Sequence, residues 1–224
     1  MPKRITPLVT DQYYHIFNRS INKEPIFVNT SDCNRAFTTL NYYKVKNPPI
    51  RLSYFLALGV DRRQEIVKSI LTEGDKLVEL IAFCLMPNHF HFLLKQTAEN
   101  GTSIFLARFQ NSYTRYFNTK HARQGHVFQG QFKAVRIEDE EQLLHVHRYI
   151  HLNPYTSYVV KTFEELEHYF YSSLPEYLGE SSSEICTKDI ILSQFRTRKA
   201  YKKFIFDQAK YQRKLDKIKH LILE

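Results

Sequence analysis

The stretch CLMPNHFHFLLK, residues 84–95, carries the clearest structural signal in the sequence. An apolar run over Leu77–Met86 precedes a second run over Phe90–Lys95, and both have the length and composition of strands. Pro87-Asn88 stands between them as a turn signal. The sequence therefore predicts a β-hairpin whose turn lies at these two residues.

Side chains alternate between the two faces of a strand, which divides this stretch into two sets. Phe90 and Phe92 share one face, which we expect to pack into the core, whereas His89, His91 and Lys95 share the other. Two imidazoles at this spacing can reach one metal ion. A lone His-x-His pattern is equally compatible with solvated histidines or with histidines satisfied in the core.

Further elements are expected on both sides of the hairpin. They are a strand over 13–17, a helix capped by Ser31 or Asp32, a helical stretch over 62–71, a helix over 103–120, a strand over 127–137 and a helix over 140–152 stopped by Asn153-Pro154. This order predicts an α+β fold of ferredoxin-like kind, in which a single antiparallel sheet has helices on one face. A helical, basic C-terminal extension follows. We therefore expect a main domain over residues 1–160 and this extension over residues 161–224.

Composition narrows the classes of function. The chain has 224 residues, a formal charge of +9 and a pI near 9.3, which favours a polyanionic partner such as nucleic acid. The three cysteines are odd in number and widely separated, so they predict neither a disulfide framework nor a zinc site. No run is apolar enough for a signal peptide or a membrane span, and we expect a cytoplasmic protein.

Tyr149 and Asn153 are separated by four residues on the helix predicted over 140–152 and its end. An i, i+4 pair projects from one face of a helix, about one turn apart. The amide oxygen of Asn153 is a hard ligand that would complete a Mg²⁺ or Mn²⁺ site begun by two imidazoles. On the residues alone, Tyr149 can also be one buried aromatic among 15 tyrosines, and Asn153 a helix cap.

His145 and His147 repeat the spacing of the histidine pair, but on a predicted helix. Residues two apart on a helix point about 200° away from one another. We therefore expect that they do not share a metal ion.

Three motifs occur in order along the chain: MPNHFHFLL at residues 86–94, FQGQFK at 128–133 and RYIHLNP at 148–154. Together they resemble the motifs of the single-tyrosine HUH transposases, and more narrowly those of their REP-associated branch. The stretch from His15 to Phe27 is similar to the opening strand and loop of that family. The resemblance covers most of residues 12–206. One departure is Gln131, where an arginine is more usual in the family, and this puts one expected DNA contact in doubt.

The resemblance implies a transposase-like endonuclease and strand transferase acting on single-stranded or hairpin DNA. In that family a histidine pair, here His89 and His91, binds a divalent metal with help from a polar residue, here Asn153. The helix tyrosine, here Tyr149, attacks DNA and forms a 5′-phosphotyrosine intermediate. The metal is expected to be Mg²⁺ or Mn²⁺, and a monomer is favoured over a homodimer. Two other readings stay open, a non-catalytic nucleic-acid-binding protein of the same fold and a hydrolase that uses water.

Basic side chains that could contact DNA phosphates occur in several of these segments. They are Lys95, Arg108, Arg115, Lys133, Arg198 and Lys202.

Overall fold

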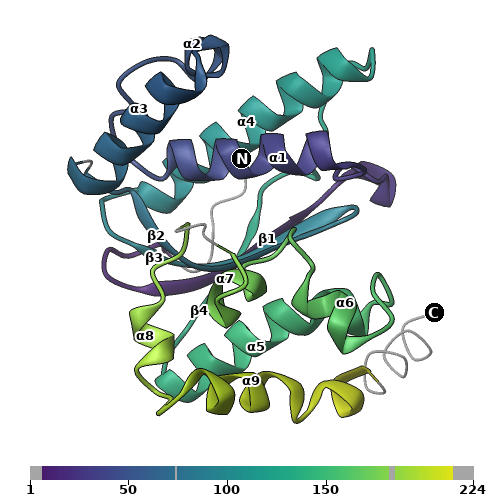
Figure 1. The fold of residues 1–224 in the computed structure, drawn as a ribbon. Helices are drawn as coiled ribbons and strands as arrows, with labels where there is room; N and C mark the ends of the chain where they lie inside the picture. The colour runs from purple at the N-terminus through teal and green to yellow at the C-terminus, as the bar shows by residue number, and fades with distance from the viewer. Residues whose placement is uncertain (1–6, 74, 182–184, 214–224) are drawn as a thin grey trace.

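A four-stranded antiparallel sheet in the order β2-β3-β1-β4 forms the centre of the molecule (Figure 1). The computed structural model describes residues 7–73, 75–181 and 185–213, so the last part of the predicted C-terminal extension lies outside the described residues. The strands are β1 (Tyr13–Arg19), β2 (Val78–Met86), β3 (His89–Gln96) and β4 (Lys133–Arg136). The helices are α1 (Thr30–Tyr43), α2 (Leu52–Ala57), α3 (Val60–Glu73), α4 (Gly101–Lys120), α5 (Glu140–Thr156), α6 (Phe163–Glu167), α7 (Leu174–Leu178), α8 (Asp189–Leu192) and α9 (Arg198–Phe206), with a short 3₁₀ turn over Ile21–Lys23.

The predicted hairpin is confirmed. Strands β2 and β3 pair with Met86 opposite His89, so the turn consists of Pro87 and Asn88. The Pro87 carbonyl accepts hydrogen bonds from the backbone N–H groups of Ile26 and Phe27, at 2.7 and 3.0 Å. The turn is therefore fixed by the loop before α1 as well as by its own sequence.

Helices cover both faces of the sheet, which Figure 1 shows with α1 and α4 on one side and α5 and α9 on the other. The rings of Phe90 and Phe92 each lie 5.4 Å from that of Phe109 in α4. His91, which points the other way from β3, contacts Asn153 of α5. The α+β fold class with one antiparallel sheet is confirmed, but the helices are not confined to the one face expected from the sequence.

Most element boundaries differ from the prediction by a few residues, and three of these differences have a clear physical reason. Helix α1 is capped by Asn29, whose side chain accepts a hydrogen bond from the backbone of Asp32, so neither Ser31 nor Asp32 is the cap. Strand β4 is shorter than the predicted 127–137, because the chain before it makes only an isolated bridge to Ser20.

Helix α5 continues through Pro154 to Thr156 instead of stopping before the proline. Proline lacks an N–H group and disfavours a helical residue before it. Here Leu152, Tyr155 and Thr156 are all buried, and their packing keeps the last turn helical. Asn153 is therefore held inside the helix and not at its end.

The C-terminal segment packs on α5. Tyr201 and Ile205 of α9 are fully buried and belong to the same apolar cluster as Ile150 of α5. The division of the chain at residue 160 stays a prediction. No helix among residues 7–73, 75–181 and 185–213 has the length and apolarity needed to cross a bilayer.

Candidate metal and tyrosine site

Three histidines from two neighbouring strands lie together on the α5 face of the sheet. His89 and His91 of β3 have ring centroids 5.0 Å apart, and His91 is only 6% exposed. His15 of β1 stacks on His91 at 5.1 Å, and its Nε2 lies 2.9 Å from His91 Nδ1. The predicted histidine pair is thus extended by a third imidazole from the adjacent strand.

Helix α5 brings Tyr149 and Asn153 to this group. The Asn153 side-chain Nδ2 lies 3.3 Å from His91 Nε2. The Tyr149 ring meets His91 edge-on at 5.6 Å and His15 at 5.9 Å, while 41% of Tyr149 remains exposed. A phenol that is accessible on one side and borders imidazoles on the other can meet a substrate strand from solvent. The reading of Tyr149 as a buried core aromatic is wrong.

Burial keeps the three imidazoles neutral. It lowers the pKa of His15 and of His89 to about 4, with the positive charge of Arg19 adding to the effect at His89. Burial and the neighbouring His15 hold the pKa of His91 well below its usual range. Unprotonated imidazoles keep a free lone pair at pH 7, which is the form that binds a metal ion.

The hydrogen bonds made by the Nδ1 atoms are compatible with a free lone pair on Nε2 in both predicted ligands. His89 Nδ1 lies 2.6 Å from Asn88 Oδ1, so it donates its proton there and Nε2 keeps its lone pair. His91 Nδ1 lies 2.9 Å from His15 Nε2, and in the tautomer in which Nδ1 is the donor of this hydrogen bond, Nε2 keeps its lone pair. Histidine ligands usually donate their second ring N–H to such an acceptor.

The amide of Asn153 can present its oxygen to the same place. A flip of the Asn153 amide, which exchanges Oδ1 and Nδ2, would point the oxygen at His91 Nε2. Ser157 Oγ, which lies 3.2 Å from Oδ1, would then accept a hydrogen bond from Nδ2 instead of donating one to the oxygen. Two imidazole nitrogens and one amide oxygen are donor atoms of the kind that a divalent ion takes. Within the part of the chain that the structure describes, no group of three His, Cys, Asp or Glu side chains is placed to hold a metal. Any ion here would depend on the amide as a ligand.

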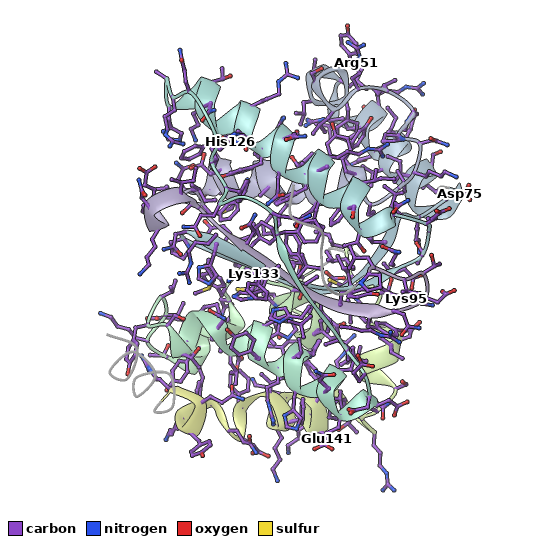
Figure 2. The ribbon with its side chains drawn as sticks, turned by 180° about the vertical axis from the view of Figure 1, so that it is seen from behind. Arg51, Asp75, Lys95, His126, Lys133 and Glu141 are labelled. Carbon is purple, nitrogen blue, oxygen red and sulfur yellow. The ribbon has the colours of Figure 1, made fainter. Side chains whose placement is uncertain are left out.

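Two cations lie beside the histidines. Lys133 of the edge strand β4 pairs in register with Phe17, and its Nζ lies 5.9 Å from the centroid of that ring, which itself contacts His91. Figure 2 shows Lys133 at the sheet, between the two helical layers. Arg19 pairs in register with His89 and is exposed. Both are placed to hold a phosphate near the histidines.

The other predicted DNA-contacting cations are spread over the molecule. Lys95 forms an ion pair with Asp11 at 3.1 Å. Lys202 of α9 pairs with Glu167 at 2.7 Å, and Arg198 packs beside Gly179 at the end of α7. The remaining two, Arg108 and Arg115, lie on α4, across the sheet from Tyr149. Of the six, only Lys133 lies beside the histidines and the tyrosine.

His145 and His147 do not form a pair. The His145 side chain is half exposed, and its Nδ1 lies 2.8 Å from Arg148. His147 is fully buried, with its ring 4.3 Å from that of His151. The two point to different faces of α5, as the helical geometry predicted.

The sequence alone predicts no chemical role for His15 or Arg19. Side chains in β1 alternate between the two faces of the strand: Tyr14, Ile16 and Asn18 are buried on one face, and His15 and Arg19 share the other. That pattern does not say which strand is the neighbour of β3. Only the pairing of Phe17 with His91 brings His15 and Arg19 to the site.

Stability should depend on pH through the buried histidines of α5. Burial lowers the pKa of His151 to about 3 and that of His147 well below its usual range. Well above pH 6.5, the usual pKa of an unfolded histidine, both are neutral in the folded and unfolded states, and their contribution to stability is complete. As pH falls below 6.5 only the unfolded chain takes up protons, so stability decreases towards pH 3. Each histidine should lower the free energy of unfolding by about 1 kcal/mol between pH 7 and 5.5.

Urea denaturation of His147→Leu at the two pH values tests this expectation. Both ring nitrogens of His147 lack a hydrogen-bond partner among the residues that the structure describes, so leucine should also raise stability at pH 7 by about 1 kcal/mol. The exposed His168→Gln is the matched control and should leave the pH dependence unchanged. An unaltered pH dependence in His147→Leu would contradict the assignment.

Comparison with known proteins gives two findings. Residues 8–153 match the family described as "Transposase IS200 like". A solved structure described as the REP-associated tyrosine transposase bound to a REP hairpin is similar to this fold, with a TM-score of 0.54 at 14% identity, over 84% of this chain and 91% of that chain. No curated protein sequence matches the chain. The family match ends at Asn153, and therefore includes the histidines, Tyr149 and the amide.

Proposed function

Because the chain belongs to the IS200-like transposase family, we propose that it cuts and rejoins single-stranded DNA with Tyr149 as the nucleophile. The observation that supports this most strongly is the convergence of an accessible phenol with His91 and Asn153. A core tyrosine would be covered, and a tyrosine used only for base stacking would need no neutral imidazoles beside it. The proposed reaction class is phosphodiester transfer to and from an enzyme side chain.

The phenol of Tyr149 requires activation. A free phenol has a pKa of about 10, so only about 0.1% is ionised at pH 7. A divalent ion held by His89, His91 and Asn153 would supply Lewis-acid stabilisation of the scissile phosphate when bound. Two imidazoles with one amide oxygen suit Mn²⁺ somewhat better than Mg²⁺.

The protein's own residues bind and orient the DNA strand. Arg19 and Lys133 hold phosphate oxygens, and the exposed side of Tyr149 faces the phosphorus. The Tyr149 oxygen forms a bond to phosphorus while the bond to the 3′ oxygen breaks. The phenolic proton is lost to solvent, and the departing 3′ oxygen gains one. Attack by a second 3′ hydroxyl reverses these steps and joins two strands without ATP.

A covalent adduct on denaturing gels is the direct test. Labelled hairpin DNA with a single-stranded flank is incubated with the protein and Mn²⁺, and the label is expected to migrate with the protein through a 5′-phosphotyrosine. Binding without cutting would favour the non-catalytic reading, and cutting without an adduct would favour a hydrolase. The similar solved transposase is described with a REP hairpin bound, which supports hairpin DNA as the probe. A monomer stays the expected oligomeric state.

His15 is proposed to position His91 and not to contact DNA. Its Nε2 accepts the His91 Nδ1 proton and so fixes the tautomer whose Nε2 is free for the metal. In His15→Phe we expect Mn²⁺ affinity, measured by electron paramagnetic resonance of free Mn²⁺, to fall about 10- to 100-fold. His15→Gln keeps an acceptor and should recover most of the affinity. Equal Mn²⁺ affinity in His15→Phe and wild type would exclude this role.

A further inference from the structure

A pocket of about 630 Å³ lies between helix α3 and helix α1. The residues of α3 in its wall follow the spacing of one helix face, and they are Val60, Arg63, Gln64, Val67 and Lys68. Phe37, Asn41 and Tyr42 of α1 also line it. Its volume is within the range of roughly 300–1,000 Å³ that is typical of small-molecule sites.

Helix α3 packs on α1 through its second half and leaves apolar surface in the pocket through its first half. Ile70 is 5% exposed and belongs to one apolar cluster with Tyr42 and Phe55, whose rings lie 4.8 Å apart. Val60, at the start of α3, lines the pocket but is 58% exposed. An apolar molecule in the pocket would remove this surface from water, which is favourable.

The polar groups of the pocket select an anion. Its cations are Arg63 and Lys68, and no Asp or Glu is among its lining residues in the part of the chain that the structure describes. Arg63 Nε is buried and has no hydrogen-bond partner among those residues. A guanidinium with an unused N–H forms a strong, charge-assisted hydrogen bond with a carboxylate.

Asn41 supplies a second unused polar atom to the same pocket. Its side-chain Oδ1 is buried and has no partner among the described residues. A flip of the amide would put Nδ2, a donor, at that position. An acceptor on a ligand could therefore be bound by the guanidinium of Arg63 and by the Asn41 amide.

The pocket is remote from Tyr149. The ring of Phe37 lies 5.4 Å from that of Phe83 in β2, and Phe83 pairs in register with Phe92. Tyr149 instead borders His91, on the other face of β3. Figure 1 shows α2 and α3 at the end of the molecule opposite α5 and α9. A ligand in this pocket therefore does not contact the proposed nucleophile.

We propose that the pocket binds an amphipathic carboxylate, a molecule with an apolar body and one carboxylate group, such as a medium-chain fatty acid. Val60, Val67 and Phe55 cover the apolar body, and Arg63 binds the carboxylate. A neutral apolar molecule would bury the guanidinium without a partner, and an organic cation would be repelled by it. The proposal goes beyond the proposed function and does not depend on DNA.

The test is isothermal titration calorimetry of the whole chain with octanoate, octanol and octyltrimethylammonium, which share one apolar body. Octanoate should bind most tightly and octyltrimethylammonium least. Arg63→Gln should weaken octanoate binding about 10- to 100-fold and leave octanol binding nearly unchanged. Arg62→Gln removes the same charge from the neighbouring residue, which pairs with Glu65 at 2.5 Å, and should bind octanoate like the wild type.

A second variant tests the place of binding. Val67→Trp fills the pocket and should abolish octanoate binding, with circular dichroism as the check on folding. Val28→Trp adds the same ring at an exposed valine outside the pocket and should bind normally.

The proposal would be overturned by the absence of octanoate binding, by equal affinity for octanoate and octanol, by equal losses in the Arg63 and Arg62 variants, or by wild-type binding in a folded Val67→Trp. These results are independent of the adduct assay, because no DNA or metal is present. Octanoate binding should also persist in Tyr149→Phe.

Discussion

Tyr149→Phe is expected to abolish the covalent protein–DNA adduct and to reduce cleavage of hairpin DNA by about 10⁴-fold or more. The substitution removes one oxygen atom, and that atom is the proposed nucleophile. The ring stays, so its edge-on contacts with His15 and His91 are kept. Denaturing gels with labelled DNA and Mn²⁺ give the measurement, and hairpin affinity should change little.

The matched control for this experiment is Tyr158→Phe. Tyr158 is also exposed and lies just beyond the end of α5, but it has no contact with the histidines among the described interactions. It should form the adduct at the wild-type rate. Cleavage that survives Tyr149→Phe would refute the proposed nucleophile, and would point to water or to another residue.

His91→Ala is expected to cause the second large loss, at least about 10²-fold in both Mn²⁺ affinity and cleavage. His91 is the centre of the group, because its Nδ1 contacts His15, its Nε2 contacts Asn153, and Tyr149 borders its ring. Loss of a ligand removes direct coordination, which should exceed the 10- to 100-fold effect of losing a supporting residue. Free Mn²⁺ is measured by paramagnetic resonance, and cleavage on the same samples.

Two controls separate metal binding from folding. His145→Ala removes a half-exposed histidine from the other pair, and should leave Mn²⁺ affinity and cleavage unchanged. His91→Gln fills more of the buried space than alanine, and circular dichroism should show a folded protein that still lacks wild-type Mn²⁺ affinity. Wild-type Mn²⁺ binding by a folded His91 variant would exclude His91 as a ligand.

The sequence by itself determined the hairpin, the placement of His89 and His91 on one face of its second strand, and the common face of Tyr149 and Asn153. These features depend on local periodicity, two residues for a strand and 3.6 for a helix, and local periodicity is written in consecutive residues. Periodicity also distinguishes the two pairs of histidines: His89 and His91 share a face of a strand, whereas His145 and His147 point to different faces of a helix. The ordered motifs indicated the family, which the match over residues 8–153 then showed.

Features that depend on contacts between distant segments were decided only by the tertiary structure. Strand β1 lies between β3 and β4, and this brings His15 and Lys133 beside His91, although 76 residues separate the two histidines. The helices cover both faces of the sheet, which puts α5 over the histidines and α4 on the far side. Periodicity says which side chains share a face, but only packing of the whole chain says what each face meets.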